Sequence, residues 1–308
     1  MTTNPALQQL GFSANDRVFV FHADDIGLNY ASVAAYENLL TDSPLSSAAT
    51  MVPCAWFPYA ATVCNNYLSH PNHDMGVHLT LTSEWNHCRW RPLSTIDPAS
   101  GLLDTDRYFP QQVEPVQRDA AIGVVEQELR AQVERAISAE IDITHIDTHM
   151  GTLMHPRFFP TYMELALEYN VPAFGVRWTV PYLMQRGLDQ AVAEQIVAYL
   201  ADVAARGMPQ FDGSFMLPLD QGFTLSDRLE IAKQMLNSAE AGLYYFLLHP
   251  CIETPALRKL APDWKARVGD YNLFMSDEWR REIEASGIKI VGMKTLRDAM
   301  RKERTTNK

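Results

Sequence analysis

The chain contains 308 residues, of which 47% are hydrophobic and 20% charged, and its formal net charge is −11. This composition is typical of a globular protein with a sizeable core. Because no dense Lys/Arg cluster occurs, it argues against nucleic acid as a partner. No apolar run reaches the length of a membrane span, and residues 1–17 lack the pattern of a signal peptide. The four cysteines show no C-x-x-C spacing, so we expect free thiols and a cytoplasmic location. Composition leaves the formation of a homo-oligomer open.

Short apolar runs alternate with helical patterns along most of the chain. This repetition predicts a parallel sheet with helices packed outside it. Eight such units favour an α/β fold of the TIM-like (β/α) barrel type, distorted or seven-stranded, with a doubly wound open sheet as the alternative. The expected strands are 18–22, 47–53, 75–81, 143–149, 173–178, 213–217, 244–249 and 288–291, and the expected helices are 29–40, 57–68, 121–138, 157–169, 188–205, 225–239, 276–285 and 294–301.

Two long connections are expected within this pattern, at about residues 83–115 and 178–243. No segment has the composition of a linker, so we predict a single catalytic domain over residues 1–308. Long loops after barrel strands often carry function. The first loop contains Trp85, whose ring could stack on a sugar or could instead pack a small core beneath the loop.

Two adjacent carboxylates follow the first predicted strand. The apolar run at 18–21 leads into His22, Asp24 and Asp25, and Gly27 then permits a sharp turn. Parallel α/β proteins place their catalytic groups at the carboxyl ends of such strands. One Asp there could merely cap the next helix, but two in succession favour a functional site.

The third and fourth predicted strands direct further titratable groups inward. Alternation along 75–81 places His78 on the face away from the helices, where it is either a hydrogen-bonded core residue or a ligand. Alternation along 143–149 places His145, Asp147 and His149 on one face. Burying three ionisable groups without a purpose would cost several kcal/mol, so a functional cluster is favoured, although a hydrogen-bonded inner network could produce the same pattern.

His249 and Arg177 end two later strands. His249 follows the apolar run 244–248, and Arg177 ends 173–177, where it could simply pair with a surface carboxylate. The carboxyl ends of barrel strands meet at one mouth, so these groups and those of the earlier strands are expected to converge there.

Imidazole and carboxylate groups are the usual ligands of a hydrolytic divalent metal. Asp25, His78 and His149 each end a different strand and would leave one position for water. Asp147 or His145 could orient a liganding imidazole. This pattern predicts one divalent metal ion as the cofactor.

The remaining candidates suit proton transfer and substrate contacts. Asp24 would take a proton from the water, and a cationic His249 could donate one to a leaving group. Arg177 could hold the substrate or the base in place, while His22 neighbours the base.

The motifs around these residues resemble those of the YdjC/ChbG-like carbohydrate deacetylase family. HADDIG at 22–27 is similar to the family's N-A-D-D-F-G, GVHLTLT at 76–82 to G-x-H-x-x-L-T, and THIDTH at 144–149 to T-H-x-D-S-H. The segment 169–177, which ends in Arg, and His-Pro-Cys at 249–251 are similar to two later family features.

This resemblance runs from about residue 17 to 295. It implies a (β/α) barrel-like hydrolase that uses one divalent metal to remove N-acetyl groups from amino sugars or short chito-oligosaccharides. By motif position it implies Asp25, His78 and His149 as ligands, Asp24 as the base and His249 as the acid. The ion is expected to be Mg²⁺ or Zn²⁺. The resemblance to the family implies Mg²⁺ as often as Zn²⁺, whereas the set of donor atoms suits Zn²⁺.

Three departures from the family pattern leave the substrate open. His22 stands where the family has Asn, Cys251 replaces Gly, and the segment ending in His155 lacks the family's run of histidines. They raise the question of whether deacetylation is altered or abolished. The alternatives are another metal-dependent barrel hydrolase or isomerase acting on a sugar or related small molecule, which would require more carboxylates or a second metal, and a catalytically inactive sugar-binding relative.

Overall fold

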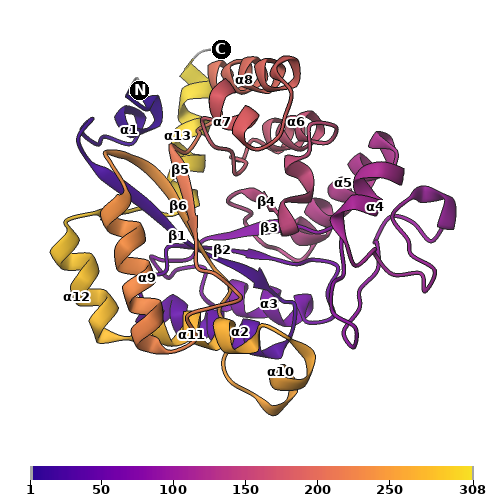
Figure 1. Ribbon diagram of the computed structural model, residues 1–308, viewed down its shortest axis with the longest axis horizontal. Coiled ribbons are helices and arrows are strands. Elements are labelled where there is room, and N and C mark those ends of the chain that lie inside the picture. The colour runs from indigo at the N-terminus through magenta and orange to yellow at the C-terminus, as the bar shows by residue number, and fades with distance from the viewer. Residues whose placement is uncertain (1–2, 307–308) are drawn as a thin grey trace.

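A parallel sheet forms the centre of the computed structural model, which describes residues 3–306 (Figure 1). Six strands pair in the order β4-β3-β2-β1-β6-β5, and the short β7 pairs with the start of β1. The two ends of the predicted domain, 1–2 and 307–308, lie outside the described residues. The strands are β1 (Arg17–Ile26), β2 (Ser47–Thr50), β3 (Met75–Leu79), β4 (Ile146–Thr148), β5 (Gly213–Met216), β6 (Gly242–Leu248) and β7 (Lys289–Ile290).

An irregular segment, residues 173–176, crosses the gap between β4 and β5. Ala173 bridges Ile146 of β4, and Val176 bridges Phe211 just before β5. The expected strand at 173–178 is therefore reduced to isolated bridges, because Pro172 has no N–H to donate and the Trp178 N–H turns back to Val176. The sheet curls into a seven-stranded, distorted (β/α) barrel, which confirms the predicted fold class.

Helices surround the sheet in Figure 1, and the eight expected helices are all present. Five more were not expected: α1, α4, α7, α10 and α11. The expected loop at 178–243 contains α7, α8, β5 and α9, whereas 83–115 contains little regular structure beyond one 3₁₀ turn. The helices are α1 (Pro5–Gln9), α2 (Tyr30–Asp42), α3 (Phe57–Asn66), α4 (Val113–Asp119), α5 (Ile122–Ser138), α6 (Phe159–Tyr169), α7 (Val180–Gln185), α8 (Gln190–Ala205), α9 (Leu225–Ser238), α10 (Pro255–Leu260), α11 (Trp264–Met275), α12 (Asp277–Ser286) and α13 (Met293–Thr306), with 3₁₀ turns η1 (Pro98–Ser100) and η2 (His149–Met154).

The helix α11 matters most among the unexpected ones. Arg267 and Asp270 are buried on it beside apolar residues such as Phe274, so its apolar positions form no stripe of helical period. It packs against α2, α9 and α12, which fixes it beside the end of β1.

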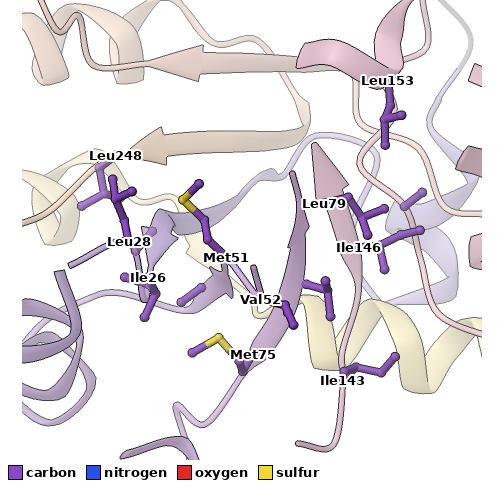
Figure 2. Close-up of a cluster of buried hydrophobic side chains, with 14 of the residues drawn as sticks. Ile26, Leu28, Met51, Val52, Met75, Leu79, Ile143, Ile146, Leu153 and Leu248 are labelled. Carbon is purple, nitrogen blue, oxygen red and sulfur yellow. The ribbon is translucent and has the colours of Figure 1, made fainter. Parts of the chain in front are cut away.

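The central strand β1 separates two environments. Phe19 and Phe21 point to the outer layer, where Phe21 contacts the rings of Phe246, Phe274 and Trp279. Alternation turns the residues between and beyond them toward the barrel interior. Another part of the outer core, with Ile26, Met75, Leu79 and Ile146 among its members, is shown in Figure 2. No helix within residues 3–306 has the length and hydropathy to cross a membrane.

Candidate metal centre

A bulge at the end of β1 brings both acidic residues of the first motif to one cavity. Consecutive side chains of a regular strand point to opposite faces. Here the pairing of β1 with β2 shifts register between Ala23 and Ile26, and Asp25 has a φ of 64°. This left-handed conformation is rare for a residue with a side chain, and such positions gather at functional sites. As a result Asp24 and Asp25 both line the same cavity.

Three acceptor atoms converge beside this bulge. Oδ1 of Asp25 lies 3.3 Å from Nε2 of His78 and 3.1 Å from Nδ1 of His149. The two imidazole nitrogens are 3.2 Å apart. All three side chains are buried. Ligand atoms about 2.1 Å from a tetrahedrally coordinated ion lie roughly 3.4 Å from each other, so the spacing is that of a metal site.

The other nitrogen of each histidine is held by a carboxylate. His78 Nδ1 lies 2.7 Å from Oδ1 of Asp147, and His149 Nε2 lies 3.0 Å from Oε2 of Glu84. A metal binds the neutral form of an imidazole, and in that form donation to these carboxylates places the proton of each ring on its outer nitrogen. The converging nitrogens then carry lone pairs, so they cannot hydrogen-bond each other.

Asp25 is held in the same manner. Arg267 donates from Nη1 to Oδ2 of Asp25 at 2.7 Å. Within residues 3–306, the opposite oxygen, Oδ1, is buried and has no hydrogen-bond donor. Buried acceptors are seldom left in this state, and one that faces two imidazole nitrogens at these distances fits a bound cation. The residues present therefore suit one divalent ion.

The charges around the cluster favour a cation as well. Burial alone would raise the pKa of Asp25, but Arg267 and His149 hold it well below its usual value. Burial would lower the pKa of His149, but Glu84 and Asp25 raise it to about 9. Asp147 and Asp24 likewise raise the pKa of His78 well above its usual value against the effect of burial. The same acidic neighbours that attract protons to these imidazoles would stabilise a metal ion.

Asp24 is held on one side and faces the cavity on the other. Its Oδ1 lies 2.7 Å from Nδ1 of His22. Its Oδ2 lies 3.9 Å from Nε2 of His78 and 3.9 Å from Nε2 of His249. Burial lowers the pKa of His249 more than Asp25 and Asp24 raise it, so the neutral imidazole is favoured. This differs from the sequence-based expectation of a cationic His249.

A chain of hydrogen bonds runs from Asp24 down the barrel interior. His22 Nε2 is 2.8 Å from Nε2 of His145, and His145 Nδ1 is 2.8 Å from Oγ1 of Thr144. Thr144 Oγ1 donates to Oδ1 of Asp74 at 2.5 Å. Burial lowers the pKa of His145 well below its usual value, so this imidazole is neutral. The chain anchors His22, and through it Asp24, to the amino-terminal end of the barrel.

Gly76 leaves the space that this chain needs. A Cβ added to Gly76 on β3 would lie 2.5 Å from the His145 ring, which is closer than such atoms approach. The second-motif glycine therefore serves packing rather than chemistry.

The cluster forms one wall of a cavity of about 870 Å³. Trp85 lines this cavity, with the guanidinium of Arg267 5.3 Å from its ring centre. Tyr245 lines it too and donates to Oδ2 of Asp147. The structure thus brings together Asp24, Asp25, His78, Trp85, Asp147, His149 and His249 around the cavity, with His22 and His145 buried beneath them.

Arg177 does not join this group. It pairs with Asp212 at 2.8 Å and lines a different cavity, beside Asn4 and α8. The structure therefore does not bring Arg177 together with the other predicted site residues. His155 also lies outside the cavity lining.

Glu84 and Arg267 are the functional candidates that sequence reasoning missed. Glu84 stands just past the second motif, in a stretch without periodicity, although its acidic side chain so close to His78 was a signal. Arg267 lies on α11, which the sequence pattern did not predict. A search for a cation to balance so many buried carboxylates could have pointed to it.

Comparison with known proteins places these motifs in a family. A family model described as YdjC-like protein matches residues 18–285. The chain is 33% identical over 281 residues to a carbohydrate deacetylase of Thermus thermophilus, which covers 89% of this chain and 92% of that protein. It is 31% identical over 170 residues to a carbohydrate deacetylase of Geobacillus stearothermophilus, covering 54% of this chain and 62% of that protein.

The fold has a counterpart among solved structures. The crystal structure of a putative cellobiose-phosphate cleavage protein from Enterococcus faecalis superposes with a TM-score of 0.72 at 19% identity. It covers 91% of this chain and 99% of that one. At this identity the likeness concerns the fold.

Proposed function

Because the chain belongs to the YdjC-like family, we propose that it is a metal-dependent hydrolase that removes the N-acetyl group from an amino sugar or a short N-acetylated oligosaccharide. The observation that carries this proposal is the set of three buried acceptor atoms, on Asp25, His78 and His149, that face one point. Its position within the matched family motifs links the geometry to amide hydrolysis.

Asp25, His78 and His149 would hold the ion. When bound, a divalent metal polarises the amide carbonyl and a water molecule. Two imidazoles and one carboxylate favour Zn²⁺ over Mg²⁺, which prefers oxygen ligands, so we propose Zn²⁺ with Mg²⁺ as the alternative. Asp147, Glu84 and Arg267 keep the three ligands in orientation.

Asp24 is the proposed general base. His22 fixes Oδ1, so that Oδ2 is the oxygen presented to an attacking water. His249 lies beside the same oxygen, so it is positioned to receive the proton that Asp24 takes from the water and to pass it to the departing amine. Trp85 lines the cavity and is the proposed aromatic contact of the sugar.

The proposal extends to organisation and location. We treat residues 1–308 as one catalytic domain. All four cysteines, which lie in the described part of the chain, are free, and this supports a cytoplasmic enzyme. The sugar is the proposed partner, whereas association with membranes or nucleic acid has no support in the charge pattern.

The test is the Asp24→Asn variant, which keeps the size of the side chain but removes the base. We expect kcat for acetate release from N-acetylated glucosamine oligomers to fall about 10²–10⁴-fold, because general bases contribute on this order. The divalent metal content should stay at the wild-type level. Asp106→Asn, at an exposed position, is the matched control. An unchanged kcat in Asp24→Asn would contradict the mechanism.

A further inference from the structure

The cavity has two unlike walls. One is the cluster of titratable groups, and the other is mostly apolar and is built by η2, β5, the loop after β5, residue 174 and the end of β6. Three residues of the apolar wall are unusually exposed for their type: Met150 at 58%, Met216 at 52% and Phe223 at 42%. The remaining members of this wall are Met154, Phe174, Leu219 and Leu247.

Exposed apolar side chains beside a catalytic cluster indicate an apolar ligand group. Single exposed apolar residues are common, but several that gather at the wall of one cavity mark a binding surface for an apolar group. The hydroxyls of a bare sugar would leave Met150 and Met216 without suitable contacts. Methionine adapts to irregular apolar shapes, which suits an alkyl or aryl substituent attached to the sugar.

The negative charge of the cavity argues against anionic ligands. Its lining holds the carboxylates of Asp24, Asp25, Glu84, Asp147, Asp220 and Asp263, and within residues 3–306 its one Lys or Arg is Arg267. That guanidinium is already bound to Asp25 at 2.7 Å and to Asp263 at 2.9 Å. Even with a divalent ion in place, carboxylates remain in excess, so a phosphate or carboxylate on the substrate would meet like charge.

Two other cations belong to an adjoining cavity. Arg258 and Lys259 line a smaller space that shares only Glu84, Trp85 and Pro262 with the main cavity. Arg258 is also paired with Glu253. Neither cation lines the main cavity, so a phosphate on a sugar ring bound there would not contact them.

We propose that the substrate is an uncharged N-acylated amino sugar that carries an apolar substituent, and that phosphorylated and acidic sugars are rejected. This inference rests on the proposed function, because it assigns the substrate class of the same site. The apolar wall selects the substituent, and the excess of carboxylates excludes the anions.

Three matched compounds test it: the methyl glycoside of N-acetylglucosamine, its 6-phosphate, and the octyl glycoside. We measure kcat/KM for acetate release by the metal-loaded wild type, and binding of the same compounds to metal-loaded Asp24→Asn. The octyl glycoside should be preferred over the methyl glycoside by about tenfold or more, the gain expected from burying a few methylene groups. The 6-phosphate should be disfavoured by about tenfold or more through charge repulsion.

Single substitutions connect these preferences to the apolar side chains and to the carboxylates of the cavity. Phe223→Ser should lower the octyl-to-methyl ratio by several-fold, and Asp220→Lys should relieve the rejection of the 6-phosphate by several-fold. Both positions are exposed, so folding should be preserved. Leu225→Ser, close in sequence and 38% exposed but outside the cavity lining, should leave both ratios unchanged.

Equal or better processing and binding of the 6-phosphate would overturn the proposal, and so would an octyl glycoside no better than the methyl glycoside. Failure of all three compounds to bind would overturn it too. Release of no acetate from any compound contradicts the proposed hydrolase function alone, because the binding order on Asp24→Asn still decides the substrate class.

Discussion

A buried carboxylate lies at each end of the barrel, and the two carboxylates differ in their hydrogen-bond partners. At the amino-terminal end, Asp74 accepts hydrogen bonds from Ser47 and Thr144 on Oδ1 and from the Lys294 N–H on Oδ2. At the carboxyl-terminal end, Asp25 has Arg267 on Oδ2, while Oδ1 faces two imidazole nitrogens and has no donor within the described residues. Both side chains are 2% exposed.

The difference shows that neighbours, rather than residue type or burial, separate a structural carboxylate from a candidate ligand. Burial raises the pKa of Asp74 to about 6, because the hydrogen bonds from Lys294, Thr144 and Ser47 only partly offset it. The guanidinium of Arg267 keeps Asp25 ionised despite the same burial. A buried carboxylate whose oxygens all accept hydrogen bonds belongs to the scaffold. A buried carboxylate that stays ionised and has one oxygen without a donor points to a bound cation.

Asp25→Asn should have the largest effect, because it removes the charge that distinguishes the metal centre from the amino-terminal end. The amide has no negative charge to offer the ion, and its NH₂ group would face either Arg267 or the two imidazoles. We expect metal affinity and kcat/KM to fall by more than the roughly 100-fold typical of changes to outer partners of a metal site. Metal content after dialysis, measured beside Asp106→Asn, provides the check. Retention of one ion per chain with full activity would refute the ligand assignment.

Asp74→Asn tests the amino-terminal end. A carboxyl group with a raised folded-state pKa stabilises the protein fully below its unfolded value of about 3.9. That stability is lost as the pH rises toward 6, because the folded state then carries a buried charge. Wild type should therefore lose about 2 kcal/mol of unfolding free energy between pH 4 and 7 from this group, and Asp74→Asn should lack that loss.

Urea unfolding with a chelator at several pH values measures this difference. Asp106→Asn, with its exposed side chain, should keep the wild-type pH profile. Parallel profiles for Asp74→Asn and wild type would show that Asp74 is ionised in both states, against the present interpretation.

Glu84→Gln should lower the metal affinity by less than Asp25→Asn does. Glutamine can still accept the hydrogen bond from His149 Nε2, but the charge is lost. Partners of liganding histidines are worth about 10–100-fold in metal affinity, and because the hydrogen bond is kept we expect the low end, about tenfold. Titration with Zn²⁺ against a competing chelator measures it, with the exposed Glu114→Gln as the control. An affinity equal to that of Glu114→Gln would remove Glu84 from the metal centre.

The sequence predicted the barrel and most of the carboxyl-terminal cluster because both depend on local patterns. Strand alternation directs His78 and Asp147 inward regardless of what surrounds them. Residues that depend on tertiary placement were missed or, in the case of Arg177, lie away from the expected group. Arg267 lies on a helix whose buried charges hide its period, Glu84 lies in an irregular loop, and Arg177 follows a segment that never becomes a regular strand.

Asp74 shows the same limit at the other end. Its partners come from β2, from the residue before His145 and from the start of α13, more than two hundred positions away. Such a meeting of distant segments has no periodic signature, so only the folded chain reveals whether a buried carboxylate is fully bonded.

The absence of a side chain at Gly76 affects Asp24, although the two residues are not in contact. A single added methyl there would drive the His145 ring out of its seat, and the ring could then no longer touch His22. His22 in turn is the side chain that steadies Asp24. A residue without a side chain thus helps to orient the proposed base. We therefore expect substitutions of Gly76 to disturb Asp24 through His145 and His22.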